Sequence, residues 1–288
     1  MNAMITPEML HKKVDGLPSL PTSVMSLAEL ADNDLSTLDD IYRVLVMDPA
    51  LASSILRLAN STMFASGNLV CDLRTAIQRL GMDAILNLGR GVAVIRNYRA
   101  GDFLDVVHLW QHSTTVGLTA KAICIHLKNH SLAEVAFLAG LLHDIGKIVL
   151  DRCFNDEYAP VVQAVKNGEN ELETEKKHLN ITHVEVGALM AVQWKFPEII
   201  VEAIRDHHNP KQGSFLTKLI HYSDLLVRTR LPYSMADRKL VLNFDSDPVF
   251  QEMIFGISGN IPDIEYLTFK IDDEVDHAIS FVQLAYQD

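Results

Sequence analysis

The chain has 288 residues and a formal net charge of −12 at pH 7, with 48% hydrophobic and 22% charged residues. This composition is that of a globular protein and excludes a disordered chain. The net negative charge disfavours nucleic acid as a partner, since no compact basic patch offsets it. Arg90, Arg96 and Arg99 come nearest to one, and ordinary helix-surface arginines explain them.

No apolar run approaches the roughly 20 residues that a membrane-spanning helix needs. The segment Met1 to Val14 lacks the apolar centre of a signal peptide. The three cysteines, Cys71, Cys124 and Cys153, are few and far apart, so they form neither a zinc motif nor a disulfide framework. These features predict a cytoplasmic protein that does not act at a membrane.

Capping residues predict the first helices. Ser36 is a candidate N-cap, and acidic residues follow it in the first turn. Asp48-Pro49 predicts the next helix start, because proline at the first helical position loses no hydrogen bond. Asp72 predicts the start of a helix that ends at Gly81.

Longer helices are expected in the middle of the chain. The apolar stretch Phe103 to Leu127 predicts one buried helix. Another is expected from Leu132 to about Leu142, which places His143 and Asp144 at its end.

Further helices are predicted towards the C-terminus. Thr182 and Glu185 fit the capping-box pattern and predict a helix start. Other helices are expected from Pro197 to His208, from Ser214 to Val227 and from Asp272 to about Tyr286. Strand alternation is absent, so we predict an all-α fold.

Changes in composition predict three parts. They are residues 1–100, an N-terminal helical part; 101–230, a second helical part; and 231–288, an accessory helical tail packed on the second part. The first boundary falls in Arg96 to Asp102, where polar residues interrupt the apolar pattern. Beyond it, the tail is more acidic and has turns at Pro232, Pro248 and Pro262.

Candidate metal ligands are spread over five predicted helices. They are His112, His143, Asp144, His183, His207, His208 and Asp224. Imidazole together with carboxylate suits Mn, Fe, Co, Ni or Zn. Asp144 is the natural bridge between two ions, and two ions about 3.5–4 Å apart can clamp a phosphate. Facing helices of a bundle can bring such side chains together.

Each of these residues also has an ordinary interpretation. A single buried residue such as His112 is usually a packed, hydrogen-bonded side chain. His207 and His208 could lie at a helix C-terminus, where the dipole favours cations. His183 could be only the first helical residue after its cap. Lys147 could contact a substrate phosphate, or could be a C-terminal cation after a glycine that ends the helix.

The segment Leu141-Leu142-His143-Asp144-Ile145-Gly146-Lys147 resembles the signature of the HD superfamily of metal-dependent phosphohydrolases. Further segments resemble the HDOD domain, the HD-related output domain, in order and spacing. They are Leu17-Pro18-Ser19-Leu20-Pro21, Asp48-Pro49-Ala50-Leu51, Leu58-Ala59-Asn60-Ser61, Ala76 to Gly81, His183 to Gly187 and Ala203 to His208. The resemblance covers roughly residues 15 to 230. It implies a multi-helical HDOD architecture, with an N-terminal helical subdomain before an HD-type helical bundle.

The resemblance also implies hydrolysis of phosphomonoesters or phosphodiesters, often of nucleotides, with one or two divalent ions per chain. By this likeness a first metal would be held by His112, His143, Asp144 and Asp224, and a second by His183, His207 and His208. Asp144 and Lys147 would be the catalytic residues. The sequence after His208 lacks the Gly-Tyr-Pro loop of HD-GYP phosphodiesterases, so cleavage of a cyclic dinucleotide is not implied.

Two functions follow as alternatives. The first is a metal-dependent phosphohydrolase acting on a phosphoester or nucleotide, in bacterial signalling. The second is a non-catalytic signalling module that binds a protein partner through the N-terminal helical part, Leu17 to Arg99. HDOD proteins commonly act as regulatory modules, which motivates the second.

Overall fold

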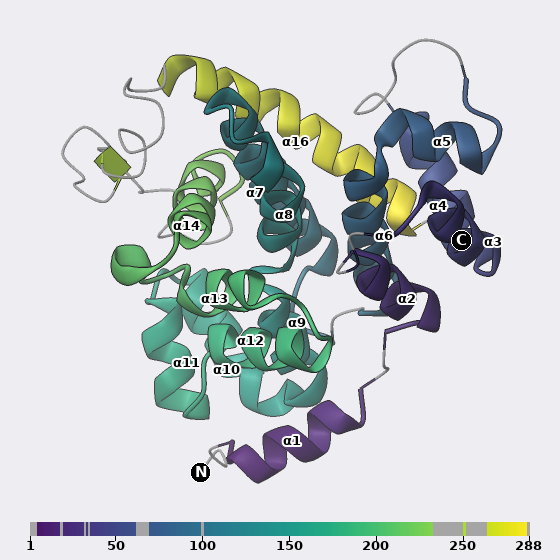
Figure 1. Ribbon diagram of the computed structural model, residues 1–288. Coiled ribbons are helices and arrows are strands. Elements are labelled where there is room, and N and C mark those ends of the chain that lie inside the picture. Colours follow the sequence, from purple (N-terminus) through teal and green to yellow (C-terminus); the bar gives the residue numbers. More distant parts are fainter. Residues whose placement is uncertain are drawn as a thin grey trace.

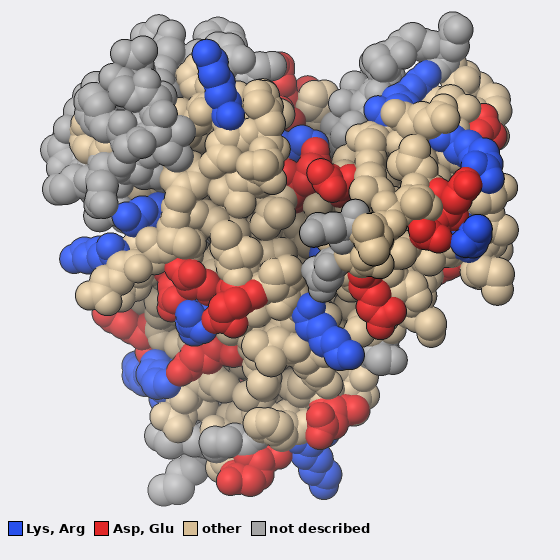
Figure 2. Space-filling view, viewed as in Figure 1, with Lys and Arg blue, Asp and Glu red and all other residues tan. Residues whose placement is uncertain are grey.

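The computed structural model describes residues 5–17, 20–31, 33, 35–61, 69–98, 101–232, 250–251 and 264–286. All regular structure in these residues is helical, which confirms the predicted all-α fold (Figure 1). None of the described helices combines the length and the apolar character that crossing a bilayer requires. The described side chains in Figure 2 mix acidic and basic groups, without a broad basic area on that face.

The described residues in the first part of the chain form six helices. They are α1 (Pro7–Asp15), α2 (Thr22–Ala31), α3 (Leu38–Val46), α4 (Pro49–Ala59), α5 (Leu73–Leu80) and α6 (Met82–Asn97). Helices α2 to α5 all pack against α6, and α1 lies apart from them, against a later helix.

The remaining helices follow in chain order: α7 (Val106–His126), α8 (His130–Leu142), α9 (Ile145–Cys153), α10 (Asn155–Lys166), α11 (Glu171–Leu179), α12 (His183–Gln193), α13 (Glu198–Asp206), the short 3₁₀ helix η1 (Pro210–Gln212), α14 (Phe215–Arg228) and α16 (Ile264–Tyr286). The pair α7 and α8 is the centre of this part, with α14 packed on α7 and α13 on α8. Figure 1 shows α16 lying along α7 and continuing towards α6 and α4.

Most predicted helix starts are confirmed. The carboxylate of Asp48 accepts a hydrogen bond from the N–H of Leu51 at 3.0 Å, and Pro49 is the first residue of α4. Asp72 caps α5 in the same way, and Gly81 follows that helix with a positive φ of 85°. Such caps satisfy N–H groups that have no partner within the helix.

The predicted cap at Ser36 is wrong by one residue. Thr37 caps α3, in a reciprocal capping box with Asp40. The hydroxyl of Ser36 instead donates to the carbonyl of Leu30 at the end of α2, at 2.7 Å. A hydroxyl that serves the preceding helix cannot cap the following one, and this contact is not visible in the local sequence.

Two other helix bounds differ from prediction by three or more residues. The helix expected from Phe103 starts at Val106, because Asp105 caps it through a bond from the N–H of His108 at 3.0 Å. The last helix begins at Ile264, eight residues before the expected Asp272. Pro18, Ser19, Arg99, Pro248 and Pro262, named above, lie outside the described residues.

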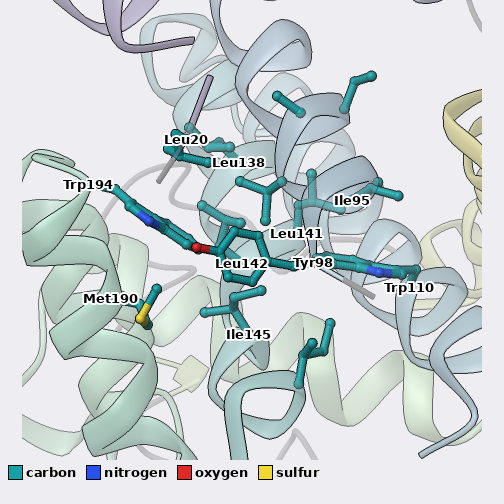
Figure 3. Close-up of a cluster of buried hydrophobic side chains, with 14 of the residues drawn as sticks. Leu20, Ile95, Tyr98, Trp110, Leu138, Leu141, Leu142, Ile145, Met190 and Trp194 are labelled. Carbon is teal, nitrogen blue, oxygen red and sulfur yellow. The ribbon is translucent and has the colours of Figure 1, made fainter. Parts of the chain in front are cut away.

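Of the two hydrophobic clusters among the described residues, one runs through both parts of the chain, from Ile5 to Ala285. Figure 3 shows Tyr98, at the end of α6, beside Trp194, at the end of α12. Their rings meet edge to face with centroids 4.9 Å apart. The parts predicted as 1–100 and 101–230 therefore share apolar core, and α16 contacts helices of both. The proposed boundaries stay a prediction.

Candidate metal centre

The fold brings together all seven side chains that the sequence singled out. They come from α7 (His112), from the corner between α8 and α9 (His143 and Asp144), from the first residue of α12 (His183), from the end of α13 (His207 and His208) and from α14 (Asp224). Six are buried and His208 is partly exposed. The cluster therefore lies inside the helical bundle, with His208 nearest to solvent.

One side of the cluster is built around Asp224. The Nε2 atom of His112 lies 3.0 Å from its Oδ1, and Nε2 of His143 lies 3.9 Å from the same oxygen. Nε2 of His143 is also 3.4 Å from Oδ2 of Asp144. Two imidazoles and two carboxylates thus face one another on this side.

The other side is built around the second oxygen of Asp144. Its Oδ1 lies 3.3 Å from Nε2 of His183 and 3.8 Å from Nε2 of His207. Nε2 of His208 is 3.2 Å from Nε2 of His183. Asp144 therefore lies between two groups of ligand-type side chains and presents one oxygen to each.

Two of the imidazoles have their outer nitrogen fixed by the backbone. Nδ1 of His143 lies 2.6 Å from the carbonyl of Gly140, and Nδ1 of His207 lies 2.9 Å from that of Ile204. A carbonyl only accepts, so each Nδ1 carries a proton, and in its neutral form each ring presents the lone pair of Nε2 to the cluster. Neither Nε2 atom has a hydrogen-bond partner in the described structure.

Burial and neighbouring charges set the ionisation of the cluster. Burial, with the nearby His143, lowers the pKa of His207 to about 3, so this ring is neutral at pH 7. Burial alone would raise the pKa of Asp144, but His143 and Lys147 hold it well below its usual range. For Asp224 burial again acts to raise the pKa, but the hydrogen bond and charge of His112, together with the charges of Arg228 and His143, hold it well below its usual range.

Lys147 lies at the start of a helix and not at a helix end. It lies in the first turn of α9, which runs through Gly146, so its interpretation as a helix C-terminal cation is wrong. The buried ammonium donates to Oδ2 of Asp144 at 2.8 Å and to Oε2 of Glu171 at 2.9 Å. These ion pairs outweigh burial and raise its pKa well above the usual value.

Gly146 continues the helix because α9 and α12 cross closely there. A Cβ atom at Gly146 would overlap the carbonyl oxygen of His183 and lie 2.8 Å from the backbone nitrogen of Gly187. The glycine is thus required by packing and not by a helix end. The same crossing fixes the backbone of His183 beside Asp144.

Two acidic residues at the cluster were not predicted. Glu171 and Glu175, both on α11, lie close to His183. They are the first and last residues of the run Glu-Leu-Glu-Thr-Glu. The glutamate between them, Glu173, is exposed, and the local sequence does not distinguish it from the other two. Only the packing of α11 against the rest of the fold distinguishes the inward side chains.

The residues fit a metal site. Asp144, Asp224 and Glu175 are buried acidic side chains, and Lys147 is a buried cation near them. Oδ1 of Asp144 and Nε2 of both His143 and His207 are buried without a hydrogen-bond partner in the described structure. Buried polar atoms without a hydrogen-bond partner require an explanation. Divalent transition metals bind nitrogen and oxygen ligand atoms of this type.

Comparison with known proteins agrees with this fold. The chain matches the HDOD domain family over residues 17–210. An HDOD domain protein of unknown function from Geobacter sulfurreducens superposes with a TM-score of 0.81 at 21% identity, covering 96% of each chain. A protein from Shewanella amazonensis, described as a proposed phosphohydrolase, has a TM-score of 0.76 at 26% identity, covering 96% of this chain and 98% of its own.

A relative known from sequence is an uncharacterized protein of Treponema pallidum. It is 26% identical over 242 residues, which are 81% of this chain and 47% of the relative. This chain thus spans about half of that relative's length. Since the family match extends over residues 17–210, well over half of the 288 residues, the chain belongs to the HDOD domain family.

Proposed function

We propose that this chain is a metal-dependent phosphohydrolase of the HD type, acting on a phosphomonoester or phosphodiester. The observation that carries the proposal is the position of Asp144. One of its oxygens faces His143, and the other faces His183 and His207. A carboxylate shared in this way is the arrangement expected where one side chain bridges two ions that together bind a phosphate.

The charge of the cluster supports the proposal. Buried carboxylates are costly unless they are paired with cations. Lys147 pairs with Asp144, and the partly exposed Arg228 lies 3.7 Å from Oδ2 of Asp224. One or two divalent ions would balance the remaining negative charge. The proposed phosphohydrolase of Shewanella amazonensis, which shares the fold, lends further support.

In this proposal one ion would be held by His112, His143, Asp144 and Asp224, and a second by Asp144, His183, His207 and His208. A bound divalent ion supplies Lewis acidity toward a phosphoryl oxygen and a source of hydroxide near neutral pH.

The protein's own groups prepare the site. Lys147 holds Oδ2 of Asp144 at 2.8 Å, which leaves Oδ1 turned towards His183 and His207. The backbone carbonyls of Gly140 and Ile204 keep the Nε2 lone pairs of their histidines directed inwards. A substrate approaches from the side of His208, the partly exposed member.

The test begins with metal content, measured by elemental analysis of protein purified without an affinity tag, next to Asp144→Ala. We expect one to two transition-metal ions per chain in the wild type and fewer in the variant. The loaded protein is then assayed with p-nitrophenyl phosphate, bis-p-nitrophenyl phosphate and nucleotides. Loss of turnover in Asp144→Ala is the expected result, and a fully loaded wild type that hydrolyses none of them overturns the proposal.

One observation favours the alternative, a non-catalytic signalling module. Six of the seven cluster residues are buried, which gives a large substrate little access to them. A buried metal would then serve stability, and a protein partner would bind elsewhere, on the N-terminal helices. This alternative predicts that Asp144→Ala changes partner binding only through stability, which a comparison of binding with thermal unfolding of both proteins would reveal.

A further inference from the structure

A buried carboxylate from α11 contacts the first residue of α12. Glu175 and His183 are both fully buried, at 0% exposure. Oε2 of Glu175 lies 2.8 Å from the backbone nitrogen of His183 and 2.8 Å from its Nδ1 atom. One oxygen therefore accepts from both the main chain and the ring of the same residue.

These two hydrogen bonds determine how the ring is protonated. A carboxylate oxygen is an acceptor, so Nδ1 of His183 must carry the proton. In the neutral ring Nε2 then has a lone pair, which points towards Oδ1 of Asp144 at 3.3 Å and Nε2 of His208 at 3.2 Å. The opposite tautomer would place the Nδ1 lone pair against the carboxylate and an N–H inside the cluster.

The position of His183 in its helix explains why another helix must supply this acceptor. His143 and His207 lie at helix ends, and each bonds the carbonyl three residues earlier in the turn just completed. His183 is the first residue of α12, where no completed turn precedes it. The first N–H groups of a helix also lack partners within that helix. Glu175 satisfies both needs.

We propose that Glu175 is a positioning residue of the metal centre. Its carboxylate fixes the orientation and the Nδ1–H tautomer of His183, so that Nε2 is available to a divalent transition-metal ion. The inference rests on the proposed function only in taking His183 as a metal ligand. Partners of this kind typically contribute 10–100-fold to metal affinity because they orient the ligand and increase its basicity.

The first experiment titrates Zn²⁺ into full-length, metal-free protein against a competing chelator. Glu175→Met keeps a similar volume but removes the acceptor, so we expect affinity about 10–100-fold weaker than wild type. Glu175→Gln keeps an amide oxygen that can accept the same two bonds, and we expect it to recover most of the loss. Glu173→Met, on the exposed face of the same helix, is the matched control. Unchanged affinity in Glu175→Met overturns the inference.

The second experiment needs no variant at Glu175, so it holds even where Glu175→Met folds poorly. Nitrogen-15 NMR of histidine rings in Zn²⁺-loaded wild type, with the signals of His183 assigned by His183→Gln, reports which nitrogen is protonated. We expect the proton on Nδ1 and the metal on Nε2. A proton on Nε2 refutes the inference.

The two proposals fail in different ways. Zinc affinity that depends on Glu175, in a protein that hydrolyses no phosphoester, would refute the proposed function and leave this inference standing. Wild-type affinity in Glu175→Met would refute the inference whatever the activity.

Discussion

The imidazole of His207 is buried among other imidazoles, and this surrounding keeps it neutral. Its pKa is lowered to about 3, whereas that of an unfolded histidine is about 6.5. Below about pH 6.5 this histidine binds a proton in the unfolded chain but stays neutral in the folded chain. This contribution to stability is therefore present above about pH 6.5 and is lost as the pH falls towards 3.

We expect His207 alone to lower the free energy of unfolding of metal-free protein by about 2 kcal/mol between pH 7 and pH 5. Urea denaturation at both pH values, with a chelator present, measures this change. In His207→Gln the free energy of unfolding should fall by about 2 kcal/mol less than in the wild type between the same two pH values. His126→Gln, at an exposed position on α7, is the control and should keep the wild-type difference. An equal difference in all three proteins would contradict the prediction.

The sequence predicted the candidate metal ligands of the cluster but not the acidic side chains of α11 that contact them. His143, Asp144 and Lys147 belong to a short sequence signature that can be recognised without a structure. Glu175 is eight residues before His183 on another helix, and nothing local distinguishes it from Glu173. Which face of α11 turns inwards depends on tertiary packing, which a single sequence does not display.

Among the helices, α12 matters because its cap also holds a candidate ligand. Thr182 accepts from the N–H of Glu185, and the carboxylate of Glu185 accepts from the N–H of Thr182 at 2.8 Å. Thr182→Ala should lower the free energy of unfolding by about 1 kcal/mol and also weaken Zn²⁺ binding, since His183 is the next residue. Thr37→Ala removes the equivalent capping box of α3, far along the chain from the cluster. It should show a similar stability loss in urea denaturation and unchanged zinc affinity; a loss of affinity in both would contradict the prediction.

The crossing of α9 and α12 gives a second prediction. Gly146→Ala places a methyl group against the carbonyl of His183, so one helix must move. We expect a stability loss of about 1–3 kcal/mol, together with weaker Zn²⁺ binding.

Gly16→Ala is the matched control for this crossing. A Cβ there meets Lys13 O at 3.4 Å, an ordinary contact. Its effect should be neutral or slightly stabilising, because alanine reduces the freedom of the unfolded chain. Thermal unfolding and zinc titration of both variants provide the comparison. A Gly146→Ala protein as stable as Gly16→Ala would show that the crossing is looser than the structure indicates.

Helix starts were the most predictable elements, because a cap is a local interaction. Asp48, Asp72 and Thr182 were identified from residue type and spacing alone. Gly146 was misjudged because the same residue type serves two purposes. Glycine often ends helices, but it also permits close helix crossings. The choice depends on a partner helix some forty residues away in sequence.

For the whole molecule, the shared core predicts that the chain unfolds as one unit. Phe281 of α16 is fully buried and meets Phe137 of α8 edge to face, with centroids 5.7 Å apart. Phe281→Ala should cost about 3–5 kcal/mol. Circular dichroism and tryptophan fluorescence should still report a single coincident urea transition at lower denaturant.

The matched change for the core is Phe103→Ala, at a side chain 39% exposed, which should cost about 0.5 kcal/mol or less. Two separate transitions in Phe281→Ala would mean that the two parts of the chain fold independently. Both tryptophans, Trp110 and Trp194, lie in the shared cluster, so fluorescence reports on that core.

The all-α class was predictable from the helix caps, the helical spacing of apolar residues and the absence of strand alternation. The continuity of the core was not predictable, because hydrophobic periodicity indicates an apolar face but does not identify the helix that packs against it. The contact of Tyr98 with Trp194 joins residues almost one hundred positions apart. The helix α16 shows the same limit, since its contacts with both parts of the chain arise only in the folded molecule.

Lys147 gives the protein a positive charge of its own at the centre of the acidic cluster, held by Asp144 and Glu171. In the proposed metal centre, synthesis and metal uptake would therefore be separate events: the polypeptide would fold around an internal ammonium group, and a divalent ion would enter the folded bundle. Such a site would not select its ion while the chain is folding. Nitrogen and oxygen donors rank first-row ions by a general order of affinity, so the ion carried would depend on which one the surroundings supply at the moment of loading.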